Sequence, residues 1–141
     1  MKAGPMTTLA PARNIVELTG DRQSGKTETL IRVAIADAIA GRRVLFGTYL
    51  WAVARSTFDR IANEIDNDWI TRIRRSAGNL RIELVNGGLI EVRAVTTNSH
   101  RGLDCDTVIL DDAHEYEQHI PTAIVSTNAS PNPRVYIARQ A

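Results

Sequence analysis

The stretch from Gly20 to Thr27 has the residue types and spacing that point most directly to chemistry. It reads G-D-R-Q-S-G-K-T, a full match to the phosphate-binding pattern G-x-x-x-x-G-K-[ST]. The glycines let successive backbone N–H groups turn toward one anion, and the helix that follows adds its own unpaired N–H groups. Lys26 supplies a positive charge for the outer phosphates, and the Thr27 hydroxyl is a ligand for Mg²⁺. The alternative is a glycine turn that binds nothing; we favour a nucleotide phosphate site.

Two adjacent acids, Asp111 and Asp112, form the expected second half of such a site. They follow the short run T-V-I-L, which reads as a buried strand. A carboxylate at the end of that strand holds Mg²⁺, so Asp111 is the predicted metal ligand, and Asp112 is placed to polarise an attacking water. The alternative is that one of them only caps a helix that starts at Ala113. His114 completes the sequence D-D-A-H, which is close to the D-E-A-H box of helicases. We expect His114 itself to be a polar residue in a loop.

Alternating strands and helices must position these residues. Hydrophobic periodicity predicts a strand before the phosphate loop, a helix after it, and a β-hairpin around Asn86-Gly87-Gly88. The predicted elements are strands 14–19, 44–48, 107–110 and 134–138, helices 28–40 and 51–65, the hairpin 80–95, and short helical stretches at 115–120, ending at Pro121, and 121–126. This order predicts a three-layer α/β fold of the P-loop NTPase (RecA-like) type, with a mainly parallel central sheet and an inserted hairpin. The ligand is expected at the carboxyl ends of the strands.

Composition is that of one globular domain of 141 residues, with 43% hydrophobic residues and a net charge of +1. No apolar run approaches the length of a membrane span. The single cysteine, Cys105, fits a reducing compartment, and its acidic neighbours disfavour a thiolate. Residues 42–101 hold ten arginines against six acids. This basic middle either faces nucleic acid or is a solvated surface; the second is favoured. Its densest group, Arg72, Arg74 and Arg75, follows Trp69 in what reads as a short helical stretch.

The chain resembles the ATPase part of the large terminase subunit, the motor that packages DNA into tailed-phage capsids. The resemblance rests on the Arg-containing phosphate loop, on the stretch R-G-L-D-C-D-T-V-I-L-D from Arg101 to Asp111, and on the loop and strand 131–137. It runs over most of the chain and keeps the order of the elements. The phosphate loop alone is generic, whereas the R-G-L-D stretch that runs into the acidic strand end is the specific feature.

The resemblance implies a role for each matching position. Lys26 and Thr27 would hold phosphate and Mg²⁺, Arg22 would sense or stabilise the γ-phosphate of ATP, Asp111 would be the Mg²⁺ acid, and Asp112 would stand where the family has its catalytic Glu. The alternative for Arg22 is a surface arginine paired with an acidic neighbour. The residues expected to bind nucleotide are Gly20, Asp21, Arg22, Gln23, Ser24, Gly25, Lys26 and Thr27.

The resemblance also implies partners: double-stranded DNA, a portal, a small terminase, a separate nuclease chain and further copies in a ring, in the host cytoplasm and without a membrane. Residues 1–13 are expected to be a flexible lead-in and 14–141 an ATPase domain, incomplete at its carboxyl end and without the nuclease domain. Asp112 in place of Glu predicts slow hydrolysis by the isolated chain. A helicase-like RecA domain and a non-hydrolysing nucleotide-binding assembly module remain as alternatives.

Overall fold

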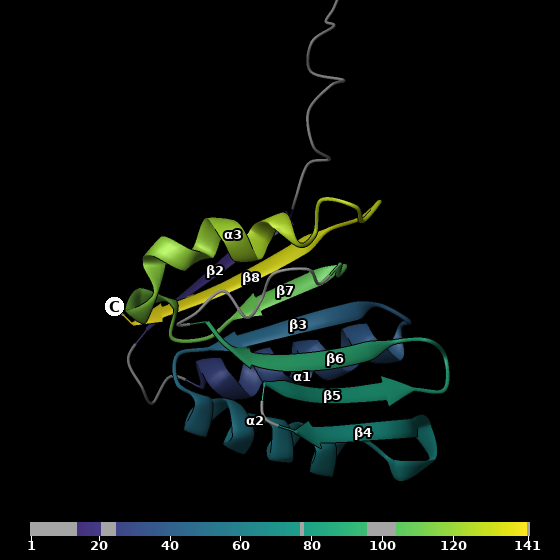
Figure 1. Ribbon diagram of the computed structural model, residues 1–141. Coiled ribbons are helices and arrows are strands. Elements are labelled where there is room, and N and C mark those ends of the chain that lie inside the picture. The colour runs from purple at the N-terminus through teal and green to yellow at the C-terminus, as the bar shows by residue number, and fades with distance from the viewer. Residues whose placement is uncertain (1–13, 21–24, 77, 96–103, 141) are drawn as a thin grey trace, which may run out of the picture.

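The computed structural model describes residues 14–20, 25–76, 78–95 and 104–140 (Figure 1). Its strands are β2 (Asn14–Gly20), β3 (Arg43–Thr48), β4 (Ile70–Ser76), β5 (Asn79–Leu84), β6 (Leu89–Ala94), β7 (Thr107–Leu110) and β8 (Arg134–Gln140). Its α-helices are α1 (Lys26–Ile39), α2 (Trp51–Glu64) and α3 (Ile120–Val125), and three 3₁₀ turns are η2 (Asn67–Trp69), η4 (Ala113–Glu115) and η5 (Glu117–His119). No helix within the described ranges is long and apolar enough to cross a membrane.

The strands form one sheet of seven in the order β2-β8-β7-β3-β6-β5-β4. From β2 to β6 every neighbouring pair is parallel, and β5 and β4 then add antiparallel pairs. The hairpin β5–β6 therefore joins the parallel sheet directly through β6, which pairs with β3. The predicted mainly parallel α/β fold is confirmed.

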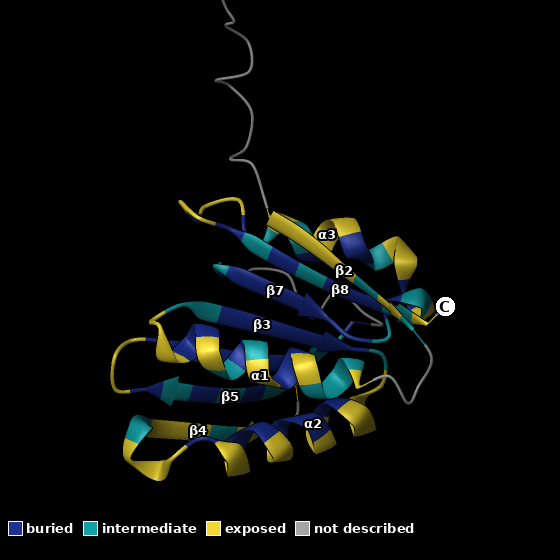
Figure 2. Cartoon of the chain, turned by 180° about the vertical axis from the view of Figure 1, so that it is seen from behind, coloured by how far each residue is buried: buried dark blue, intermediate teal, exposed yellow. Residues whose placement is uncertain are grey.

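Helices cover the two faces of this sheet. Helices α1 and α2 pack on one face, where they share a core with β3, β5 and β6, and α3 packs on the other face against β7 and β8 (Figure 1). The middle strands β3 and β7 are buried almost throughout, as Figure 2 shows. Burial on both faces explains why their sequences are apolar runs without alternation.

The hairpin turn is fixed against the carboxyl end of α1. Asn86 Nδ2 donates a hydrogen bond of 2.6 Å to the carbonyl of Ile39, one of the last carbonyls of that helix. A Cβ on Gly88 would lie 2.0 Å from the carbonyl oxygen of Ala38, so only glycine permits this approach. The turn thus ties the antiparallel part of the sheet to the helix that begins at the phosphate loop.

Two local predictions are wrong. Arg72, Arg74 and Arg75 lie on the edge strand β4, not on a helix; only Asn67–Trp69 before them is a 3₁₀ turn. Pairing with β5 decides this, because an edge strand that is exposed over most of its length shows little alternation. Pro121 lies in the first turn of α3 and does not end a helix, which agrees with the preference of proline for that position.

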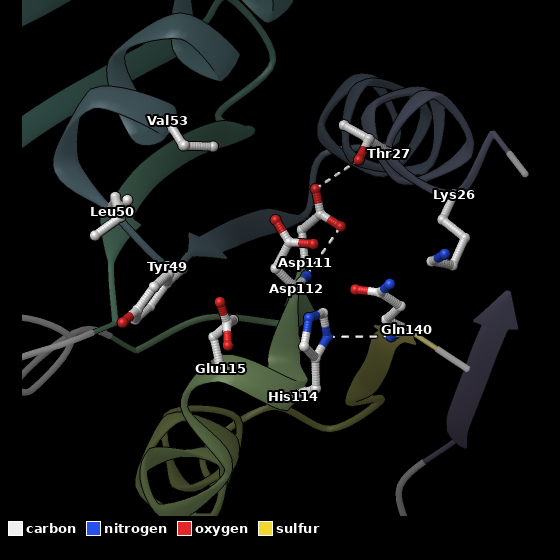
Figure 3. Close-up of a pocket in the computed structure, with 10 residues that line it drawn as sticks. All are labelled: Lys26, Thr27, Tyr49, Leu50, Val53, Asp111, Asp112, His114, Glu115 and Gln140. Carbon is white, nitrogen blue, oxygen red and sulfur yellow. Dashed lines mark hydrogen bonds between the residues drawn. The ribbon is translucent and has the colours of Figure 1, made fainter. Parts of the chain in front are cut away.

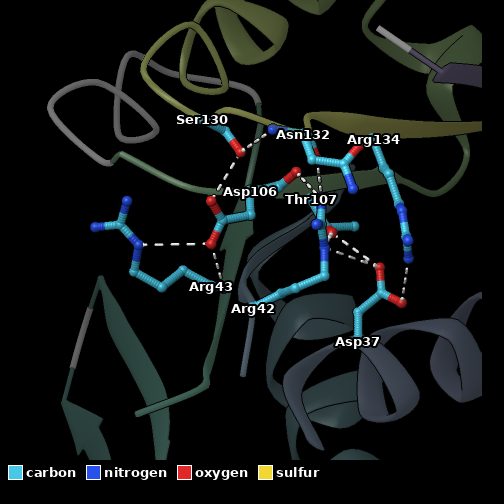
Figure 4. A network of polar contacts seen from close by, with 8 residues as sticks. All are labelled: Asp37, Arg42, Arg43, Asp106, Thr107, Ser130, Asn132 and Arg134. Atoms are coloured by element: carbon cyan, nitrogen blue, oxygen red, sulfur yellow. Dashed lines mark hydrogen bonds and ion pairs between the residues drawn. The ribbon is translucent and has the colours of Figure 1, made fainter. Parts of the chain in front are cut away.

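A polar network occupies the amino ends of the parallel strands (Figure 4). We call it the amino-end network; its members are Asp37, Arg42, Arg43, Asp106, Thr107, Ser130, Asn132 and Arg134. The buried carboxylate of Asp37 accepts from the Thr107 hydroxyl at 2.8 Å and lies 3.3 Å from an Arg134 nitrogen and 3.7 Å from Arg42 Nε. Each buried charge here has a partner of opposite sign, which offsets its desolvation.

Asp106 is held in the same network. Its oxygens accept from the Arg43 backbone N–H at 2.9 Å and from the Ser130 hydroxyl at 2.8 Å. Burial works against ionisation, but these hydrogen bonds and the charges of Arg43 and Arg42 hold the pKa of Asp106 below its ordinary value. The neighbouring Cys105 is buried, and burial raises the pKa of its thiol to about 11, so the expected neutral thiol is confirmed.

Candidate functional site

The amino end of α1 is built as an anion site would be. Gly25 precedes the helix with φ +80°, a left-handed conformation that glycine adopts without strain. The capping residue is Gly25, which has no side chain to cap the helix, and the positive end of the helix dipole lies at Lys26 and Thr27. Strand β2 ends at Gly20, directly before the loop. The predicted phosphate-loop residues Asp21, Arg22, Gln23 and Ser24 lie outside the described residues.

The carboxyl end of β7 brings an acid to this helix end. Asp111 is 3% exposed, and its Oδ2 accepts a hydrogen bond of 2.8 Å from the Thr27 hydroxyl. Its Oδ1 accepts from the Asp112 backbone N–H at 3.0 Å. The two residues predicted to hold Mg²⁺, 84 positions apart in the sequence, are thus in direct contact.

The electrostatics of Asp111 differ from those of Asp106 at the other end of the strand. Burial raises the pKa of Asp111 above its ordinary value. The Thr27 hydrogen bond counters this rise, the negative charge of Asp112 adds to it, and the Asp112 N–H and Lys26 oppose it more weakly. A cation beside this buried carboxylate would stabilise its charged form.

Asp112 has a left-handed backbone, with φ 54° and ψ 39°. Among the described residues it is the only non-glycine with positive φ, a conformation that costs free energy and that collects at functional sites. It occupies the capping position of η4, but its side chain makes no capping hydrogen bond. Helix capping therefore does not explain why a carboxylate occupies this position.

Tyr116 fixes the backbone at this point. The buried Tyr116 hydroxyl donates to the carbonyl of Asp111 and lies 3.3 Å from the carbonyl oxygen of Gly47. Burial first, and then the nearby acids, raise the pKa of Tyr116, so the hydroxyl remains a donor. The strand end that carries both aspartates is anchored to the middle of the sheet.

Lys26 and the two aspartates border one cavity of about 430 Å³ (Figure 3). Lys26 Nζ donates to the Gly20 carbonyl at 2.6 Å, which joins the first residue of α1 to the end of β2. The other residues around the cavity are Thr27, Tyr49, Leu50, Val53, His114, Glu115 and Gln140. The volume lies within the range of small-molecule sites, and one wall, from Tyr49 to Val53, is largely apolar.

Six of these lining residues were not predicted as site residues: Tyr49, Leu50, Val53, His114, Glu115 and Gln140. The amide N–H of Gln140 donates to His114 Nδ1 at 3.1 Å, which joins the end of β8 to the turn after β7. His114 was predicted to be a polar loop residue, and this hydrogen bond agrees with that prediction. Gln140 was missed because strand β8 runs two residues farther than predicted, to the edge of the cavity.

The donor set suits Mg²⁺ better than a caged transition metal. No group of three or more His, Cys, Asp or Glu side chains within the described ranges is arranged to hold a metal. Mg²⁺ is usually held by one or two protein oxygens together with water and substrate phosphates. The Thr27 hydroxyl and the Asp111 carboxylate supply two such oxygens next to the phosphate loop.

No protein-family model and no curated protein sequence matches the chain. Among solved structures, the large terminase of bacteriophage HK97 matches over 91% of this chain with a TM-score of 0.77 and 15% identity. The ATPase domain of the large terminase of Thermus phage P74-26 matches over 89%, with a TM-score of 0.65 and 20% identity for a mutant form and 0.59 and 23% for another crystal structure of that domain.

The chain spans 29% of the HK97 large terminase and 59% of the P74-26 ATPase-domain chain. At these identities the likeness is one of fold alone. The chain therefore has the α/β fold of phage large-terminase ATPase domains, the group that its sequence resembles.

Proposed function

We propose that this chain binds Mg²⁺-ATP at the cavity bordered by Lys26, Thr27 and Asp111 and hydrolyses it. The observation that carries the proposal is the 2.8 Å hydrogen bond between Thr27 and Asp111, because it joins the amino end of α1 to an acidic strand end. Helix ends of this kind bind phosphate. The raised pKa of Asp111 supports the proposal, since a bound cation would satisfy this carboxylate.

Each residue has a proposed part in the reaction. Lys26 and the N–H groups of α1 bind the phosphates and neutralise their charge, while Thr27 and Asp111 hold Mg²⁺, which supplies further neutralisation of the triphosphate. Arg22 is proposed, from the resemblance alone, to contact the γ-phosphate. Asp112 is proposed to polarise the water that attacks it.

Hydrolysis is proposed to drive packaging of double-stranded phage DNA in the host cytoplasm. The proposal rests on the likeness to large terminases and on the resemblance of the sequence. In this proposal several copies form a ring and act with a portal, a small terminase and a nuclease chain, as implied by the same resemblance.

Strand β4 offers a contact for the DNA backbone. Of the described arginines, only three form no ion pair with a described acid: Arg55, Arg72 and Arg74. Arg72 and Arg74 are two residues apart and so share one face of the strand, and Arg74 lies directly opposite Arg81 on β5. Arg81 is paired with Glu83 and Glu91, so Arg72 and Arg74 are the described cations on these two strands that remain for a DNA phosphate.

Thermal melts test nucleotide binding. A nucleotide at 100 times its Kd should raise the free energy of unfolding by about 2.7 kcal/mol. We expect melting temperature to rise with Mg²⁺-ATP, and the rise to disappear in Lys26→Ala and on removal of Mg²⁺ with a chelator. Arg32→Ala, on the exposed side of the same helix, is the control and should keep the rise. A parent chain that shows no shift at millimolar Mg²⁺-ATP would refute the proposal; a shift without phosphate release would favour the non-hydrolysing module.

Salt-dependent binding to a DNA duplex tests the second part. Each lost phosphate contact lowers the slope of log affinity against log salt by about 1. We expect the double change Arg72→Glu and Arg74→Glu to lower this slope by about 2, and Arg32→Glu, a charge reversal elsewhere, to leave it unchanged. Equal slopes for the parent and the double variant would exclude β4 as the DNA contact.

A further inference from the structure

The cavity holds a third carboxylate, Glu115, to which the sequence assigned no role. Glu115 lines the cavity together with Lys26, Thr27 and the two aspartates. No described residue forms a hydrogen bond or an ion pair with its side chain. Glu117, two residues farther, differs on both counts, because it does not line the cavity and is paired with Arg139 at 2.5 Å. Glu115 is thus an acid that lines a cavity and has no partner among the described residues.

The turn after β7 places Glu115 beside Asp112. The Glu115 backbone N–H donates to the Asp112 carbonyl at 3.0 Å, a three-residue spacing typical of 3₁₀ geometry. Both Asp112 and Glu115 line the cavity, so the turn brings the two carboxylates to the same space. Figure 3 shows the Glu115 carboxylate directed into the space between Tyr49 and the aspartates.

The turn is held firmly enough to fix this position. The next residue, Tyr116, is buried, and its hydroxyl is bound to the Asp111 carbonyl, while its N–H donates to the Ala113 carbonyl at 3.0 Å. The backbone on both sides of Glu115 is therefore tied to the strand that carries Asp111. A carboxylate on a fixed turn can be aligned with a reacting group without a large ordering cost.

Glu115 does not belong to the metal ligands. Within the described ranges no three acidic, histidine or cysteine side chains converge on one point, so Glu115 does not complete a cage with Asp111 and Asp112. The Mg²⁺ oxygens proposed above, from Thr27 and Asp111, lie at the helix end of the cavity, whereas Glu115 lines it from the turn after β7. An exposed carboxylate that lines a hydrolytic site can accept a proton there and pass it to solvent.

We propose that Glu115 is the general base of the hydrolysis, acting with Asp112 on the attacking water; this rests on the proposed function. The water oxygen forms a bond to the γ-phosphorus, and the bond from that phosphorus to the bridging oxygen breaks, with its electron pair leaving on ADP. One proton of the water passes to the Glu115 carboxylate, which then releases it to solvent. Asp112 is shorter than a Glu at the same position by one carbon–carbon bond, about 1.5 Å. The longer side chain of Glu115 makes up for this missing length.

Steady-state hydrolysis by matched variants tests the proposal. Glu115→Gln keeps the shape of the side chain but cannot accept a proton, and we expect kcat to fall about 100-fold or more. Glu117→Gln carries the same change two residues away, outside the cavity, and should stay within twofold of the parent, about the scatter of such assays. If melts show that Glu115→Gln is unfolded, Glu115→Asp takes its place, with an expected loss of about tenfold from the retracted carboxylate.

Nucleotide affinity gives a reading independent of turnover. Removing the charge of Glu115 should tighten binding of ATP about threefold and leave ADP unchanged, because only the γ-phosphate lies near that carboxylate. The proposal requires both results. A Glu115→Gln variant that keeps more than about a tenth of the parent rate, or one with an unchanged ATP-to-ADP affinity ratio, overturns it. A parent chain that hydrolyses no ATP refutes the proposed function as well; hydrolysis that needs Lys26 but not Glu115 refutes this inference alone.

Discussion

Asp106 and Asp111 lie at opposite ends of the same four-residue strand, β7, and their surroundings shift their pKa values in opposite directions. At the amino end, hydrogen bonds and two arginines hold the pKa of Asp106 down despite partial burial. At the carboxyl end, burial raises the pKa of Asp111, and the nearest other acid, Asp112, makes the rise larger. One strand therefore carries an acid whose charge the protein balances and an acid whose charge it leaves for a ligand to balance.

The same contrast holds for the whole of each end. The amino-end network pairs Asp37 and Asp106 with Arg42, Arg43 and Arg134. The cavity at the carboxyl end has three acids and, among its described lining residues, a single cation, Lys26. At the amino end, ion pairs stabilise the fold. At the carboxyl end, the excess of negative charge destabilises the empty site, and a bound cation would neutralise it.

Of the changes that test this contrast, Asp37→Asn should have the largest effect, a loss of stability. It removes the charge that faces Arg42 and Arg134, and breaking a buried ion pair from one side typically costs about 3 kcal/mol or more. Urea unfolding at pH 7 measures the loss. Asp59→Asn, which breaks the exposed pair with Arg75, is the control and should cost less than about 1 kcal/mol. If the two variants lose the same stability, the amino-end network is not the stabilising end.

Changes at Asp112 should act on turnover more than on stability. We expect slow hydrolysis by the isolated chain, and we expect Asp112→Glu to keep or raise the rate while Asp112→Asn lowers it about 100-fold, equal to about 2.7 kcal/mol of transition-state stabilisation. Phosphate release measures the rates.

Asp112→Gly tests the effect of the left-handed backbone separately from the effect of the carboxylate. Glycine accepts φ 54° without strain, so this variant should lose turnover but not stability. An Asn variant as fast as the parent would show that Asp112 has no part in the chemistry.

The smallest effects, about 1 kcal/mol each, should have opposite signs: at pH 7 Asp106→Asn should destabilise the fold and Asp111→Asn, without nucleotide, should stabilise it. The folded-state pKa of Asp106 is below 3.8, so its contribution is present above that pH and is lost as pH falls through the folded value. The folded-state pKa of Asp111 is above 3.8, so its penalty is present at neutral pH and fades as pH falls toward 3.8.

Urea unfolding of both variants at pH 7 and pH 4.5 checks these signs. The gain from Asp111→Asn should shrink at the lower pH, and Mg²⁺-ATP should no longer stabilise that variant. Changes of the same sign at pH 7 would show that the two ends of β7 do not differ as described.

The sequence was sufficient for the elements whose local signals are strong. Buried parallel strands such as β3 and β7 are apolar runs, and the hairpin is marked by Asn86-Gly87-Gly88, so both were predicted close to their observed bounds. Strand β4 was missed because it is stabilised by pairing with β5 rather than by its own pattern, and its exposed arginines fit a helix surface equally well.

The candidate site divides in the same way. Lys26, Thr27, Asp111 and Asp112 belong to short motifs, so the sequence identified them. Glu115 and Gln140 reach the cavity only because η4 folds back and β8 runs beside β7, which no local pattern encodes. Asp37 lies on the buried face of α1, and a carboxylate at such a position in the sequence was a signal for the ion network that was not followed.

The position of β2 in the sheet has a consequence for how this chain is made. Its only described sheet neighbour is β8, paired from Asn14 with Arg134 to Gly20 with Gln140. A ribosome that adds about 5–20 residues per second needs on the order of ten seconds to deliver β8 after β2. During that interval the first strand has no described sheet neighbour, because β8 pairs with all seven of its residues. We expect the proposed nucleotide site, which follows β2 and is lined by Gln140 of β8, to be complete only after β8 has been synthesised.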